Sequence, residues 1–151
     1  MNNFNDFLLE AERSLIAADH MVYVSFPLIK DKRLLIKAIQ EIKKSMFFLI
    51  RAILERENQN KKILTNGDLK LSFKNLKDSI AKKYNLSNND LVLISEIFEI
   101  SEFYKESSFE FIRGNKVVFL TEDLKPVSIS IEKIKELIVF SKGLIKRVKE
   151  K

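Results

Sequence analysis

The sequence predicts a mainly α-helical fold, an antiparallel bundle of four to five helices with a small β-hairpin inserted before the C-terminal helix. In the stretch Leu34–Leu54, six apolar residues recur at alternating spacings of four and three, which lines one face of a helix. Around Gly114-Asn115, a tight-turn signal, the pattern changes to strand-like alternation. The 151 residues fit one domain, residues 1–151. The six apolar residues are Leu35, Ile39, Ile42, Met46, Leu49 and Ile53.

The first helix is expected from Asn3 to about Phe26, with Asn2 or Asn3 as its cap. Pro27 should end or kink it, because proline lacks the amide hydrogen that a helix interior needs. A short link then leads to a second helix capped by Asp31, so the two helices should lie antiparallel. The first helix carries a core stripe of Phe4, Leu8, Ala11, Leu15, Ala18 and Val22.

The second helix contains the stretch Leu34–Leu54 and is expected to be the centre of the bundle. Phe47, Phe48, Ile50 and Leu54 widen its apolar stripe until the second half is apolar most of the way round. A helix of that kind needs neighbours on several sides.

The later elements follow from local signals. A loop is expected at 55–67, and a short helix should then bury Phe73, Leu76, Ile80 and Tyr84. Residues 87–90 resemble a capping box that opens a helix from about Leu91 to Lys105.

The hairpin is expected at about residues 109–121, with strands Phe109–Arg113 and Lys116–Thr121. Val127–Ile129 can add a third strand, and Ser130 can cap the last helix. Because a two-stranded ribbon is marginal alone, it must lean on the helices or on a partner.

The composition limits the class of protein. No apolar run approaches the ~20 residues of a membrane span, and the acidic, amphipathic N-terminus is unlike a signal peptide. We therefore expect a cytoplasmic protein with no membrane partner. The chain has no cysteine, which removes disulfides and thiolate metal sites, and we expect no metal and no cofactor.

The net charge of +6 is typical of proteins that contact phosphate-rich partners. The alternative is a solvated face, since a lysine is a compact charge without the geometry that reads a phosphate or a base edge. The densest basic segment is 61–83. Within it, our candidates for binding RNA or another polyanion are Lys61, Lys62, Lys70, Lys74 and Lys77.

His20 is the only histidine, and Arg13 precedes it by seven residues. Seven residues are nearly two helical turns, so both side chains should project from one edge, roughly 10 Å apart along the axis. A nuclease without a metal needs an imidazole to move the 2′-hydroxyl proton and a guanidinium to hold the phosphate. Together with Tyr23, Arg13 and His20 are therefore candidate catalytic residues, especially if a second copy completes the site.

The spacing of Arg13 and His20, with six residues between them, resembles the Arg-x4–6-His pattern of the HEPN superfamily. Those proteins are small helical bundles, often dimers, and many are metal-independent RNases or toxin components. The resemblance implies phosphate binding at Arg13 and acid–base work at His20. The family motif usually lies late in the domain, with a tyrosine two residues after the histidine, whereas here Tyr23 is three residues after it. The stretch Ala11–Glu55 also resembles uncharacterised small archaeal proteins.

Both candidate residues have a structural alternative. His20 can be a hydrogen-bonded histidine at the edge of the core, and Arg13 can form a surface salt bridge with Glu10 or a neighbouring helix.

The twelve phenylalanines exceed what one thin bundle needs, and burial of an apolar patch between subunits would stabilise a homodimer. Three hypotheses follow. The first is a self-associating binding or assembly module that contacts RNA, another polyanion or a protein through a lysine-rich face. The second is a HEPN-like metal-independent RNase that uses Arg13 and His20. The third is a structural subunit of a larger complex.

Overall fold

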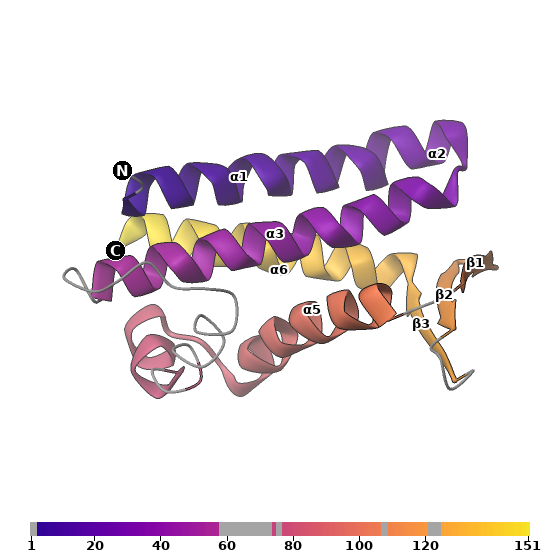
Figure 1. Cartoon of the computed structure of the whole chain (residues 1–151). Helices are drawn as coiled ribbons and strands as arrows, with labels where there is room; N and C mark the ends of the chain where they lie inside the picture. Colours follow the sequence, from indigo (N-terminus) through magenta and orange to yellow (C-terminus); the bar gives the residue numbers. More distant parts are fainter. Residues whose placement is uncertain (1–2, 58–73, 75–76, 107–108, 121–124) are drawn as a thin grey trace.

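The computed structural model describes residues 3–57, 74, 77–106, 109–120 and 125–151. Figure 1 shows long helices packed side by side, with a small sheet at one end of the bundle and both chain termini at the other. The predicted mainly α-helical bundle with a β element before the last helix is confirmed. The long helices are α1 (Phe4–His20), α3 (Lys32–Glu57), α5 (Asn88–Glu106) and α6 (Ile131–Glu150).

Helix α3 is the central helix, as predicted. It contacts α1, α5, α6 and strand β2 (Lys116–Leu120). All six residues of its predicted stripe are buried, and so are Ile50 and Leu54. Phe47 and Phe48 are half-buried, and the Phe48 ring stacks on Phe7 of α1 with 6.4 Å between ring centroids. These two rings therefore pack within the monomer rather than forming an exposed patch.

Helices α1 and α3 make the most extensive contact among the described elements. Ala11 and Ala18 face α3 with no exposed surface, which lets the two backbones approach closely. The Ser45 hydroxyl of α3 donates a 2.7 Å hydrogen bond to the Ala11 carbonyl oxygen. This bond satisfies the buried hydroxyl and fixes the register between the helices.

The sequence analysis expected one helix from Asn3 to about Phe26. The structure instead contains a π-helical turn within this segment. Helix α1 ends at His20, a π-helical turn follows at Met21–Ser25, and α2 covers Phe26–Ile29. Pro27 lies in the first turn of α2, where its missing amide hydrogen costs little. The reversal comes at Lys30, whose φ of 62° is left-handed. Asp31 then caps α3 as predicted, accepting a 2.9 Å bond from the Arg33 amide.

The predicted capping box at 87–90 is confirmed. The Ser87 amide donates to the Asp90 carboxylate at 3.0 Å, and the Asp90 amide donates to the Ser87 hydroxyl at 3.1 Å. Helix α5 therefore begins at Asn88, earlier than the expected Leu91. Asp90 also pairs with Arg147 of α6 at 3.1 Å, which ties the start of α5 to α6.

The predicted hairpin is present, and the third strand expected at Val127–Ile129 joins it in a three-stranded antiparallel sheet. The strand order is β1-β2-β3, with β1 at Phe109–Arg113 and β3 at Pro126–Ser130. Gly114 makes the tight turn with a φ of +63°. Val117, Phe119 and Ile129 are buried in the same core as the helices. The sheet thus packs on its own bundle.

Other expectations are only partly covered. Residues 55–57 continue α3 rather than starting a loop, whereas 58–67, Phe73 and Leu76 lie outside the described residues. Residues 77–84 are helical and bury Ile80 and Tyr84, as predicted. Ser130 caps α6 through a 3.0 Å bond from the Lys133 amide, also as predicted. Within the described ranges, no helix has the length and apolarity to span a bilayer.

We predict that Ala18→Leu destabilises the fold by about 1–3 kcal/mol, because the larger side chain must fit between α1 and α3. Ala17→Leu, at the neighbouring half-buried position, is the matched control and should lower the unfolding free energy much less. Chemical denaturation of both variants measures the difference in unfolding free energy. Equal stabilities would show that α1 and α3 are not closely packed there.

We predict that Asp90→Asn lowers the unfolding free energy by about 1 kcal/mol at neutral pH. Burial raises the pKa of Asp90, but the hydrogen bonds from Ser87 and the bond and charge of Arg147 together hold this pKa below its usual range. Stability from this carboxylate is therefore present above the unfolded pKa of about 3.9 and is lost as the pH falls through the lower folded value.

The difference between wild type and Asp90→Asn should therefore shrink as the pH is lowered from about 5 to 3. Thermal unfolding across that range measures it, with the exposed Asp78→Asn as control. If the stability difference between wild type and Asp90→Asn stayed the same in acid, the ionised Asp90 carboxylate would not be its source.

Candidate functional site

Arg13 lies on the outer edge of α1, where its guanidinium pairs with Glu10 at 3.1 Å. The side chains of both residues are largely exposed. This ion pair is the structural alternative that the sequence analysis named for Arg13. It is open to water and therefore contributes little to stability, so it leaves the guanidinium available to a ligand.

His20 is exposed at the last residue of α1. Its Nδ1 lies 3.3 Å from the Ser25 hydroxyl oxygen. A π-helical turn brings residues five apart in the chain next to each other, and His20 and Ser25 are five apart. The contact therefore follows from the π-helical turn that begins after His20, and the Nε2 atom has no hydrogen-bond partner among the described residues.

Tyr23 lies within the π-helical turn and is partly exposed. Its ring centroid lies 5.2 Å from the Lys135 amine of α6, a cation–π contact. Arg13, His20 and Tyr23 thus all lie at the surface of one segment, but each contacts a different neighbour. None of the contacts found in the described residues joins Arg13 to His20.

The lysine candidates fall in two groups. Lys74 and Lys77 are exposed, with Lys77 at the start of the helical residues 77–84. Lys61, Lys62 and Lys70 lie outside the described residues.

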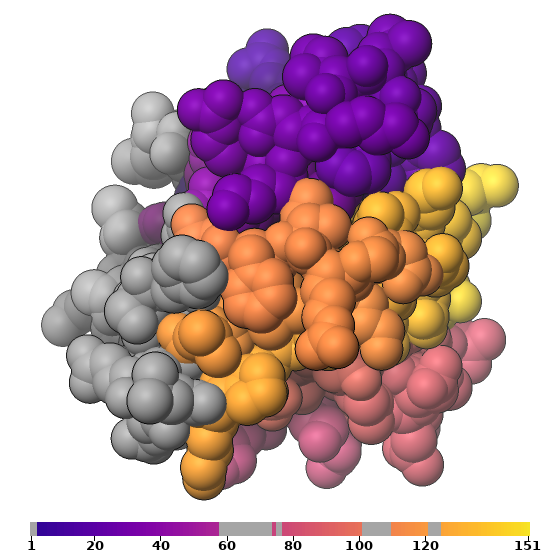
Figure 2. Space-filling model, turned by 90° about the vertical axis from the view of Figure 1, so that its right-hand side faces the viewer, coloured from indigo at the N-terminus to yellow at the C-terminus, as the bar shows by residue number. Residues whose placement is uncertain are grey.

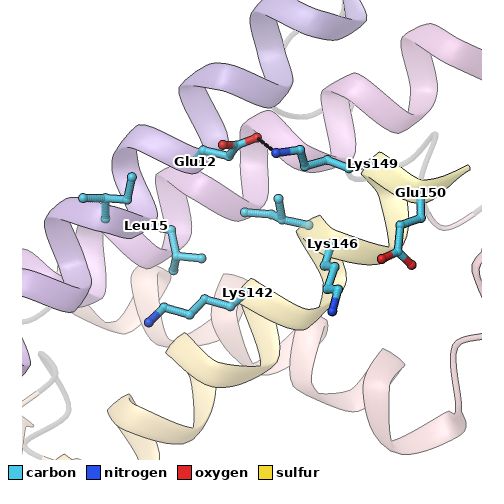
Figure 3. A pocket seen from close by; sticks show the side chains of 8 residues that line it. Glu12, Leu15, Lys142, Lys146, Lys149 and Glu150 are labelled. Carbon is cyan, nitrogen blue, oxygen red and sulfur yellow. Dashed lines mark ion pairs between the residues drawn. The ribbon is translucent and has the colours of Figure 1, made fainter.

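A groove lies between α1 and α6, and we call it the α1/α6 groove. Its volume is about 400 Å³. Figure 3 shows Leu15 and Glu12 on the α1 side and the lysines on the α6 side. Arg13, His20 and Tyr23 lie outside it. The groove is lined by Glu12, Leu15 and Ile16 of α1 and by Lys142, Ile145, Lys146, Lys149 and Glu150 of α6.

Two ion pairs cross between the helices beside this groove. Lys149 pairs with Glu12 at 3.1 Å (Figure 3), and Lys142 pairs with Asp19. Lys146 lies between these two lysines in the sequence and makes no ion pair with any described residue. The groove therefore has an apolar floor and an available amine, which suits a partner that is both apolar and acidic.

The sequence analysis missed this groove, although a signal was present. Glu12 and Asp19 are seven residues apart on α1, and Lys142 and Lys149 are seven apart on α6. Equal spacings of opposite charge are compatible with two helices that lie side by side. Across the described part of the chain, no cluster of histidine, aspartate and glutamate side chains could hold a metal ion.

No protein-family model, curated protein or solved structure matches this chain. The resemblance to HEPN proteins, which rests on Arg13 and His20, therefore remains a prediction. The resemblance to small archaeal proteins is likewise a prediction.

Proposed function

We propose that this chain is an assembly module that forms a homodimer through the face made by α1 and α6. The observation that carries the proposal is the α1/α6 groove beside an exposed apolar edge of α1. Leu9, Ile16 and Tyr23 recur at intervals of seven along that edge and are 47%, 68% and 43% exposed. Ile16 belongs both to the edge and to the groove.

The charges of the two helices are complementary. Helix α1 carries four carboxylates and one guanidinium, whereas α6 carries six cationic side chains and three carboxylates. Two of the α1 carboxylates, Glu12 and Asp19, already pair with α6 lysines of the same chain. A two-fold axis that places the acidic α1 of each copy over the basic α6 of the other therefore adds a weaker, salt-screened attraction. Such an isologous interface uses the same surface patch on both subunits, and both contacts are favourable.

The apolar edge supplies the driving force in this arrangement. Fully burying an aliphatic side chain that was exposed contributes roughly 1.5–3 kcal/mol, and a two-fold axis doubles the gain. The α1/α6 groove offers Ile16 of the second copy an apolar floor, Leu15 and Ile145. The free amine of Lys146 can then pair with a carboxylate of the second copy.

We predict that wild-type protein sediments as a dimer and that Ile16→Arg sediments as a monomer. Arginine at this position would place a positive charge against the lysines of α6 in the second copy. Sedimentation equilibrium over a range of concentrations measures the molecular mass.

Val92→Arg is the control, because Val92 is 52% exposed on α5, away from the proposed face. It should remain dimeric. Circular dichroism of both variants should match the wild type, since both positions are exposed. Monomeric wild type, or an Ile16→Arg variant that still dimerises, would refute the proposal.

A second candidate function is metal-independent RNA cleavage, favoured by one observation. Arg13 and His20 are both exposed on the α1 edge that the dimer would use, so a two-fold axis can bring them near their counterparts. His20 Nε2 would then move the 2′-hydroxyl proton while Arg13 holds the phosphate. The exposed Lys74 and Lys77 would add salt-dependent contacts to RNA.

For this candidate we predict cleavage of RNA in the presence of a chelator, with at least about a 100-fold loss in His20→Ala. The unfolding free energy of His20→Ala should stay within about 0.5 kcal/mol of the wild type, because the side chain is exposed. A substrate with a 2′-deoxy group at the cleavage position should be resistant. Equal cleavage by wild type and His20→Ala would remove His20 from the reaction.

A further inference from the structure

The turn between α1 and α3 exposes more apolar surface than a solvated turn requires. Leu28 is 80% exposed, Ile29 is 65% exposed and Val24 is 45% exposed. We call these three residues the apolar tip. Figure 1 places α2 at the end of the bundle that carries the sheet, and Figure 2 looks onto this end, with the turn region in purple above the orange strands. The apolar tip is thus a convex end of the molecule, distinct from the α1/α6 face.

The residues around the apolar tip are basic. Between Asp19 and Glu41 the chain has four cationic side chains, Lys30, Lys32, Arg33 and Lys37, and a single acid, Asp31.

The one acid, Asp31, offsets only one of these four positive charges. Asp31 pairs with Arg33 at 2.7 Å, and the hydrogen bonds from Arg33 lower the pKa of Asp31 to about 2. Lys30 and Lys37 are exposed and make no ion pair with any described residue. The end of the bundle therefore presents aliphatic side chains beside unneutralised amines.

We propose that this end of the bundle docks on an anionic lipid surface, with Leu28 and Ile29 inserted among the headgroups and Lys30 and Lys37 contacting lipid phosphates. The inference goes beyond the proposed dimer, because it uses the end of the bundle. It also differs from the expectation of no membrane partner, since peripheral docking needs no spanning helix.

Two features favour a lipid surface over a protein groove. The apolar side chains project from a convex turn, which inserts into a soft interface without needing a matching cavity. Lysine is a point charge on a flexible stem that can snorkel to headgroup phosphates, and lysines near an anionic surface strengthen attachment to it. Stable attachment to a membrane generally needs two weak signals, here an apolar insertion and a basic patch.

The chain contains no tryptophan, so one introduced tryptophan reports on its own position alone. Leu28→Trp should show a blue-shifted emission with vesicles of phosphatidylcholine and phosphatidylserine, and quenching by brominated lipids. With phosphatidylcholine vesicles alone, the shift should be small. Val139→Trp is the control, because Val139 is 63% exposed on α6, and its emission should not change.

Vesicle binding by the protein without an introduced tryptophan should depend on both the aliphatic side chains and the lysines at this end of the bundle. In vesicle flotation, Leu28→Ser with Ile29→Ser should bind the phosphatidylserine vesicles at least about tenfold more weakly. Lys30→Asn with Lys37→Gln should bind more weakly by a similar factor, and asparagine keeps the left-handed backbone of residue 30 accessible. Val139→Ser should bind as the wild type does.

Three results would overturn the proposal. The first is no binding to phosphatidylserine vesicles. The second is binding that is lost with the lysine variant but unchanged in Leu28→Ser with Ile29→Ser, which would show electrostatic adsorption without insertion. The third is a dimer, or a stoichiometric complex with another protein, that wild type forms and that the Leu28→Ser with Ile29→Ser variant does not form. This result would assign the tip to a protein interface.

Discussion

The close approach of α1 and α3 is the constraint on which the rest of the structure depends. Ala11 and Ala18 allow it, and the hydrogen bond from Ser45 to the Ala11 carbonyl fixes its register. Helix α1 packs against both α3 and α6, and its remaining edge, with Leu9 and Ile16, faces solvent. The same packing leaves Leu15 at the boundary with α6, where the α1/α6 groove opens. The candidate surface is thus a consequence of how the core is built.

The π-helical turn at Met21–Ser25 determines what lies at the end of α1. It keeps Val22 in the core while Tyr23 and Val24 are exposed. It also brings Ser25 beside His20. Single π-turns inside helices are rare and are frequent at functional sites. In this chain, the two exposed surfaces meet in the turn, where Tyr23 belongs to the α1 edge and Val24 belongs to the apolar tip.

The sequence predicted features that depend on neighbours in the chain. The stripe of α3, the capping box at Ser87 and the tight turn at Gly114 were predicted correctly, because each is set by spacing or by one conformational preference. The π-helical turn at Met21–Ser25 was not predicted, because no residue type marks such a turn in the way that glycine and proline mark other breaks. Pro27 indicated an end or a kink of the helix near Phe26, but helical backbone continues through α2 and the chain reverses only at Lys30.

The candidate site could be predicted only in part for the same reason. The sequence predicted that Arg13 and His20 share an edge, but it did not predict which helix lies beside that edge. The α1/α6 groove lies between helices from opposite ends of the chain, as the pair of Glu12 with Lys149 shows. Matching charge spacings indicate compatible helices, yet several helices here carry similar spacings, and only the packed core decides among them.

The two proposed surfaces constrain each other through symmetry. The α1/α6 face runs along the side of the bundle, whereas the apolar tip is at its end (Figure 1). A two-fold axis perpendicular to the bundle would direct the two tips to opposite ends of the dimer, so only one could reach a flat surface. An axis parallel to the bundle would direct both tips to the same surface, and the second attachment would then be intramolecular and strong. Dimers that bind vesicles much more tightly than monomers therefore require the parallel axis, whereas equal binding per chain is expected from the perpendicular one.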